Sequence, residues 1–247
     1  MRISIKTTKW YEDAYAACVI FTKLPLSKLY RPSPDSYSRA IAYWPLTGWL
    51  TGPLMAAVLY FSDMILPYQL AVILAVATRM LLTGTMYERR MRDFINQATG
   101  NHLYGNTVWA LYELLLFACL CALNTESAAM TIIAADPFAK MISGQIIQML
   151  PHAPQRSDER PQIAFQKLCT AAGLLMFCFG MTPLLAFFYI AEGERWDLIL
   201  FLPCIAMYFQ YLLILKTRRG YSDESLGMLF LLNELTVYLV VTLQAIL

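Results

Sequence analysis

The sequence has few charged residues and few of the side chains that bind transition metals. Only 15% of the 247 residues are Asp, Glu, Lys or Arg, whereas 58% are hydrophobic. A soluble domain usually carries about a quarter charged residues. Two histidines and six scattered cysteines, without the usual two-cysteine metal spacing, argue against a zinc site. A net charge of +2 gives no reason to expect nucleic acid as a partner. The composition indicates an integral membrane protein in contact with the lipid bilayer.

Long apolar runs are what the sequence has in abundance. A helix needs about twenty such residues to cross a bilayer. The second of seven candidate runs is short and contains Arg79, and the fourth contains Asp136 and Lys140, so these two are expected to face protein on one side. Without internal repeats, residues 1–247 are predicted to form a single all-α domain, a polytopic membrane helical bundle. The seven runs are 41–61, 65–82, 107–123, 128–150, 168–190, 196–215 and 226–247.

Basic residues predict the orientation of these runs. Sixteen of the 19 Lys and Arg residues lie in alternate connecting segments: seven before the first run and three in each of 83–106, 151–167 and 216–225. Cytoplasmic loops carry this excess. We therefore expect a multi-pass protein of the inner (cytoplasmic) membrane. Its N-terminal segment 1–36 would be cytoplasmic or interfacial, with 11–24 as an amphipathic helix along the interface, and its C-terminus would lie on the far side.

Five ionisable residues lie in or near the apolar runs: Arg79, Glu113, Asp136, Lys140 and Glu234. Each costs a few kcal/mol in a membrane, so each is expected to be paired or functional. Asp136 and Lys140 are four residues apart and can pair on one helix face. Glu234 can bond to a neighbouring helix. A polar path through a transporter is an alternative, but the sequence lacks the inverted repeat common in transporters.

Two polar segments flank these runs on the predicted cytoplasmic side. The first is 84–100, with three arginines, two acids and an asparagine. The second places Ser222, Asp223 and Glu224 just before the last run. Hydroxyls and carboxylates at a helix start suit phosphate or metal binding. They are equally typical of an ordinary helix N-cap.

Five segments in order resemble the cobalamin synthase family, the membrane adenosylcobinamide-GDP ribazoletransferases. They run almost from end to end: FTKLPL at 21–26, YSRAIAYWPLTGWLTG at 37–52, LLTG at 81–84, AADPFAKMISGQIIQMLPHA at 134–153 and GYSDESLGMLFLLNELTVYL at 220–239. The resemblance implies a reaction that joins α-ribazole, or its 5′-phosphate, to adenosylcobinamide-GDP and releases GMP. It also implies corrinoid and α-ribazole as small-molecule substrates and Mg²⁺ as cofactor. A metal between phosphates neutralises developing charge.

The chain departs from the family after LLTG. Three family aspartates at i, i+4 and i+7 correspond here to Arg89, Asp93 and Asn96, and about a dozen family residues are absent before the third run. Asp93, Asn96 and Glu88 are the candidate metal ligands. On a helix, however, Glu88 is about 140° around the axis from Asp93. Glu88 is expected to pair instead with Arg92, and Arg89 with Asp93.

The resemblance also suggests roles for residues outside this segment. Asp93 and Glu224 are candidate catalytic residues, and Lys140, Asp223, Ser222 and Arg79 are candidate substrate-binding residues. The changed positions favour an alternative, a catalytically inactive member that keeps the fold and binds corrinoid or pathway partners. The sequence leaves the oligomeric state open.

Overall fold

The computed structural model describes residues 10–154, 162–191 and 195–246, and this part of the chain is helical throughout, apart from connecting turns and one isolated bridge between His152 and Tyr221. The predicted all-α class is confirmed. The helices are α1 (Trp10–Phe21), η1 (Pro25–Lys28), α2 (Pro34–Arg39), η2 (Ala40–Tyr43), α3 (Trp44–Asp63), α4 (Tyr68–Thr83), α5 (Met86–Thr99), α6 (His102–Ala122), α7 (Thr125–Gly144), α8 (Ile146–Met149), α9 (Thr170–Ile190), α10 (Trp196–Arg218) and α11 (Asp223–Ile246).

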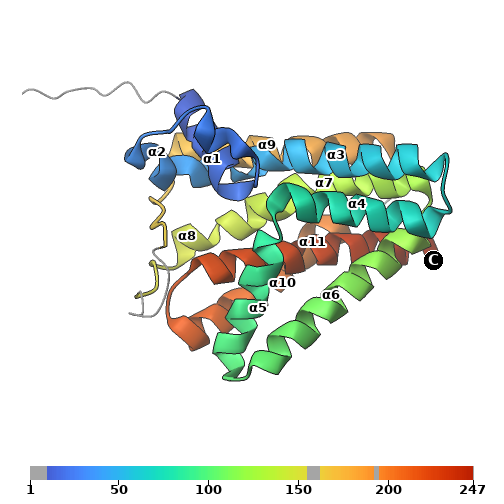
Figure 1. The fold of residues 1–247 in the computed structure, drawn as a ribbon. Coiled ribbons are helices and arrows are strands. Elements are labelled where there is room, and N and C mark those ends of the chain that lie inside the picture. The colour runs from blue at the N-terminus through green and yellow to red at the C-terminus, as the bar shows by residue number, and fades with distance from the viewer. Residues whose placement is uncertain (1–9, 155–161, 192–194, 247) are drawn as a thin grey trace, which may run out of the picture.

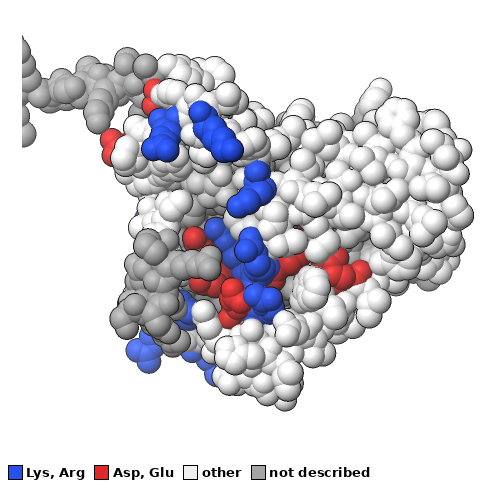
Figure 2. Space-filling view, viewed as in Figure 1, with Lys and Arg blue, Asp and Glu red and all other residues white. Residues whose placement is uncertain are grey.

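The long helices run roughly side by side, and the short ones gather at one end (Figure 1). We call this end, which holds α1, α2, α5, α8 and the start of α11, the charged end. Figure 2 shows Lys, Arg, Asp and Glu side chains gathered there, whereas the opposite half of that face is almost free of them. The C-terminus lies at the uncharged end (Figure 1). Charge therefore divides the bundle along its length.

Each predicted apolar run forms a helix, but fewer than seven of the described helices are membrane spans by length and composition. Four are long and apolar enough, namely α6, α9, α10 and α11, and the bent pair α4–α5 would be a fifth. Helix α4 has only 16 residues. Helix α3 contains Pro, Gly and Thr, and α7 carries Asp136 and Lys140. The expectation that the fourth run faces protein is confirmed, since almost all of α7 from Ala128 on is buried.

Helices α7 and α11 form the centre of the bundle. Helix α11 packs along α5, α7, α10 and α6, and α3 packs along α7. Two glycines of α3 allow this close approach: a Cβ on Gly48 would lie 2.8 Å from the Pro137 nitrogen, and one on Gly52 would lie 3.2 Å from the Ile132 carbonyl oxygen. Small residues at such contacts let membrane helices approach closely. The polar residues of α7 are thereby pressed against α3.

Most of the polar connecting segment 84–100 is not a loop but a helix, α5 (Met86–Thr99), as its predicted i, i+4 pairs assumed. Gly84 and Thr85 both adopt left-handed backbone conformations, with φ of 61° and 55°. Helix α5 therefore leaves α4 at 81° and lies at the charged end. Tyr87, Glu88, Met91 and Phe94 are its buried residues. Their spacing follows the helical period, as expected of an amphipathic helix.

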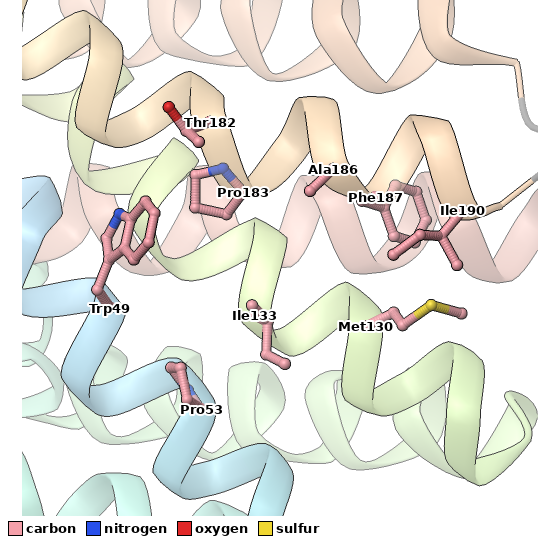
Figure 3. A pocket seen from close by; sticks show the side chains of 9 residues that line it. All are labelled: Trp49, Pro53, Met130, Ile133, Thr182, Pro183, Ala186, Phe187 and Ile190. Carbon is pink, nitrogen blue, oxygen red and sulfur yellow. The ribbon is translucent and has the colours of Figure 1, made fainter.

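An apolar groove lies on the outside of the bundle between α3, α7 and α9. Trp49, Ile133 and Phe187 are among its lining side chains, and Thr182 supplies the hydroxyl seen there (Figure 3). None of its lining residues is charged. In a bundle whose outer helices expose many large apolar side chains, such a groove belongs to the lipid-facing surface.

Candidate functional site

A buried ion pair joins α4 to α11. The Arg79 guanidinium donates to Glu234 at 2.7 Å, and both residues are almost inaccessible, with exposures of 1% and 0%. The hydroxyls of Tyr112 and Tyr238 also contact the Glu234 carboxylate, each at 3.3 Å. The expectation that Glu234 bonds to neighbouring helices is confirmed. Arg79, a candidate substrate-binding residue, is instead enclosed among protein groups.

The same arginine also reaches α5. Its Nη2 lies 3.6 Å from Oε1 of Glu88, which is 3% exposed. Neither Glu88 oxygen accepts a hydrogen bond from the described residues. The predicted Glu88–Arg92 pair is absent from the described contacts, because the turn at Gly84 directs Glu88 inward toward Arg79. The structure therefore places Glu88 in the interior, away from the other two candidate metal ligands.

A second buried pair lies between α7 and α3. The Lys140 ammonium is 2.5 Å from Asp136, which confirms the predicted i, i+4 pair. The Thr51 hydroxyl donates to the other Asp136 oxygen at 2.5 Å and accepts from Lys140 at 3.1 Å. The rings of Tyr87 and Phe230 lie 5.8 and 5.1 Å from the ammonium. Lys140 is 1% exposed, so this candidate substrate-binding residue is covered on the sides that these groups occupy.

The outer face of α5 carries the positions of the three family aspartates. Arg89 donates to the carbonyls of Gly84 at 2.9 Å and Thr85 at 3.2 Å, at the end of α4. The predicted Arg89–Asp93 pair does not form, because these carbonyls are the nearer acceptors. Asp93 instead contacts Arg92 at 3.3 Å, and its side chain is 48% exposed.

Asn96, the third of these positions, is occupied by a backbone contact. Its Oδ1 accepts the amide N–H of Gly105, in α6, at 2.9 Å. A Cβ on Gly105 would lie 2.3 Å from that oxygen and 2.4 Å from the carbonyl oxygen of Arg92. The start of α6 is therefore pressed against the side of α5 on which Asn96 lies.

The start of α11 holds the remaining candidates. Asp223 Oδ2 lies 3.3 Å from the Arg90 guanidinium, so α5 and α11 meet through opposite charges. The side-chain amide of Gln162 donates to both Glu224 oxygens at 3.1 Å, and its Oε1 accepts the Asp223 N–H at 3.3 Å. Ser222 is fully buried and exchanges bonds with Ser225, as in a helix cap. Asp223 and Glu224 thus lie next to each other at the charged end, whereas the hydrogen bonds of Ser222 cap the start of α11.

Residues 151–153 are held beside the start of α11 by backbone hydrogen bonds, since Ala153 donates to the Tyr221 carbonyl at 2.8 Å and Tyr221 donates to the Pro151 carbonyl at 2.9 Å. His152 and Tyr221 form a parallel bridge, with their rings edge to face at 5.2 Å. Burial raises the pKa of Tyr221 to about 12, so its hydroxyl stays protonated and donates to the Phe165 carbonyl at 3.1 Å. His152, Gln162 and Arg90 were not singled out from the sequence. Arg90 could have been found from its position one turn after Tyr87 on an amphipathic helix, and His152 from its place at the end of the family segment 134–153, whereas Gln162 lies outside any motif.

The predicted metal ligands do not converge. Glu88 faces Arg79 inside the bundle, Asp93 is on the outer face of α5, and the Asn96 oxygen is bonded to Gly105. Within the described ranges, no three His, Cys, Asp or Glu residues lie close enough together to hold a metal ion. Mg²⁺ prefers near-octahedral oxygen coordination. The residues present therefore do not fit a divalent cation at this place.

Comparisons with known proteins find similarity to a group of transferases. A family model described as Cobalamin-5-phosphate synthase matches residues 13–96, from α1 into α5. The adenosylcobinamide-GDP ribazoletransferase of Vibrio vulnificus (strain YJ016) is 24% identical, over 96% of this chain and 98% of its own. That of Leptospira interrogans is 22% identical over 93% and 94%. That of Shewanella amazonensis is 35% identical over 31% and 30%. No solved structure matches. Two of these relatives align over almost the whole chain, so the chain is similar to adenosylcobinamide-GDP ribazoletransferases nearly from end to end.

Proposed function

We propose that this membrane protein is an adenosylcobinamide-GDP ribazoletransferase. The observation that carries the proposal is the similarity to transferases of that name along nearly the full length of the chain. In the proposed reaction a ribose hydroxyl of α-ribazole, or of its 5′-phosphate, attacks the phosphorus linked to cobinamide. A new P–O bond forms, the P–O bond to the GMP phosphate breaks, and GMP leaves. The hydroxyl proton passes to a protein base.

The charged end supplies groups for each of these tasks. Glu224 is the proposed base, because its carboxylate lies at the start of α11 and is fixed through both oxygens by Gln162. Arg90, beside Asp223, is the proposed contact to the phosphates. Asp93, on the same helix as Arg90, retains its role as a second candidate catalytic carboxylate. Because the candidate ligands do not fit a metal, no step is assigned to one.

Direct assay of the purified protein tests this function. In lipid nanodiscs, with adenosylcobinamide-GDP and α-ribazole, it should form the joined corrinoid product, detected by chromatography and corrinoid absorbance. Glu224→Gln should lower the rate by about 10²–10⁴-fold if the carboxylate is the base. Arg195→Gln, an exposed change at the start of α10, is the matched control. Wild-type protein that binds corrinoid but forms no product above a protein-free blank would instead identify an inactive family member.

We further propose that the charged end faces the cytoplasm in the inner membrane. The excess of Lys and Arg in alternate segments supports this orientation. A periplasmic reporter such as alkaline phosphatase, fused after α11, should be active, and one fused in the turn between α10 and α11 should be inactive. The reverse pattern would overturn the orientation without affecting the proposed reaction.

A further inference from the structure

The three candidate metal ligands and the two carboxylates at the start of α11 each lie beside a nitrogen group of the protein itself. Arg92 lies beside Asp93, the Gly105 amide donates to Asn96, Arg90 contacts Asp223, and the Gln162 amide holds Glu224. Glu88 faces Arg79. These contacts come from four different parts of the chain. The pattern is that of carboxylates balanced by internal N–H groups.

Apart from Glu88, which faces Arg79 in the interior, the charges of α5 and the start of α11 balance. Arg89, Arg90 and Arg92 supply three positive charges, against the three carboxylates of Asp93, Asp223 and Glu224. Two of these carboxylates form ion pairs at 3.3 Å with the arginines. A divalent cation at the same place would have to displace a guanidinium or lie close to one, which like-charge repulsion opposes. The Asn96 oxygen already accepts the Gly105 amide, so an ion beside that oxygen would compete with this contact.

The arginines are fixed in a way that suits phosphate binding. Arg89 is exposed and is anchored by two bonds to the carbonyls at the end of α4. The side chain of Lys23 packs against the same turn, since a Cβ on Gly84 would lie 3.0 Å from its Cγ. Arg90 follows Arg89 on α5 and is only partly exposed. A planar guanidinium that is already held in place binds phosphate oxygens with little loss of freedom.

We propose that Arg89 and Arg90 take the place of a divalent cation in this chain, so that a phosphate-bearing nucleotide binds at the charged end without metal. The choice of nucleotide rests on the proposed function, which releases GMP. Guanidinium groups neutralise phosphate charge through bidentate, charge-assisted hydrogen bonds. Asp223 then orients Arg90, the carbonyls of Gly84 and Thr85 orient Arg89, and the carboxylates are not metal ligands.

Two binding measurements test this proposal. GMP is titrated into wild-type protein in nanodiscs by calorimetry, in EDTA and in Mg²⁺, and Mn²⁺ binding is followed by electron paramagnetic resonance. We expect the GMP affinity to differ by less than about twofold between EDTA and Mg²⁺, and Arg89→Gln/Arg90→Gln to weaken it by about tenfold or more. Arg195→Gln should leave it unchanged. Circular dichroism and gel filtration verify that the variants are folded.

Three outcomes overturn the proposal. The first is GMP binding that is lost in EDTA, the second is no GMP binding in either condition, and the third is stoichiometric Mn²⁺ that Asp93→Asn or Glu224→Gln removes. The first outcome is measured on wild-type protein and the third on wild type and single variants. Neither therefore depends on whether the Arg89→Gln/Arg90→Gln variant folds. Metal-independent GMP binding without transferase product would reject the proposed function alone. Product formed only with Mg²⁺ would reject this inference alone.

Discussion

Two sets of charged residues in this protein contain the same side-chain types but lie in opposite surroundings. Arg79, Lys140 and their carboxylate partners are buried inside the bundle, whereas Arg92 and Asp93 form an open pair on the outer face of α5. A buried charge that loses its partner destabilises strongly, while an exposed pair contributes little. The comparison shows that an ionisable residue within an apolar run first serves the fold. The groups proposed to contact the ligand, Arg90 and Glu224, lie instead on α5 and at the start of α11.

Removing Arg79 should have the largest effect. Arg79→Met leaves Glu234 and Glu88 buried without their cation. We expect a loss of about 3–5 kcal/mol in the free energy of unfolding. Unfolding in detergent, followed by circular dichroism, measures it, with Arg195→Met as the control. If Arg79→Met were as stable as wild type, the buried charged residues would matter no more to the fold than the exposed ones.

Lys140→Met should lower the free energy of unfolding slightly less, by about 3 kcal/mol, because Thr51 still donates to Asp136. The double variant Lys140→Met/Asp136→Leu sharpens the comparison, since it replaces a buried pair by apolar groups. We expect it to regain part of the loss, because the Thr51 hydroxyl keeps a bond to the Thr47 carbonyl at 3.1 Å. A double variant less stable than Lys140→Met would mean that Asp136 is needed for another reason.

A change beside the buried pair should have an intermediate effect. Gly48→Ala places a Cβ 2.8 Å from the backbone nitrogen of Pro137, so α3 must move away from α7. We expect a loss of about 1–3 kcal/mol, as for other overpacked interiors. The same denaturation experiment measures it. Gly173→Ala, where a Cβ meets nothing within 4 Å, is the matched control. Equal effects of the two changes would contradict the close approach of α3 and α7.

The exposed pair should matter least to stability. Arg92→Gln removes the partner of Asp93, but both side chains remain solvated, at 40% and 48% exposure. Since exposed pairs are screened by solvent, we expect the free energy of unfolding to fall by less than about 1 kcal/mol. Comparing thermal midpoints at low and high salt measures the contribution. A larger, salt-insensitive loss would show that Arg92 packs as part of the bundle.

Composition and apolar runs were enough to predict the all-α membrane class and the positions of the seven long helices. The Asp136–Lys140 pair also followed from its spacing, because i, i+4 residues share a helix face. The pair between Arg79 and Glu234 did not, since 155 residues separate the two and only tertiary packing brings them together. The predicted i, i+4 pairs already treat the segment of α5 as helical, and glycines bound it at 84 and 100. The predicted pairs Glu88–Arg92 and Arg89–Asp93 were nevertheless wrong, because the turn at Gly84 decides which side of α5 faces inward.

The candidate site was predictable as a list of residues but not as an arrangement. Asp93, Asp223 and Glu224 all lie at the charged end, as expected from their positions next to apolar runs. Whether Glu88 faces inward or outward depends on the 81° turn at Gly84 and Thr85. No local rule gives that angle. Gln162 was absent from the list because it lies outside any recognisable motif, and His152 because nothing in the family segment 134–153 marks it as a contact of α11.

The distance along the chain between Arg79 and its partner has a consequence for biosynthesis. Ribosomes release α4 long before α11, and an arginine at the centre of a membrane helix opposes insertion by about 2.5–3.5 kcal/mol. A nascent polypeptide truncated before Glu234 therefore carries Arg79 in a 16-residue helix with Glu88, at 3.6 Å, as its carboxylate partner. The closer contact, at 2.7 Å to Glu234, waits for the last helix, so an incomplete copy keeps an arginine that is only partly neutralised within an apolar helix.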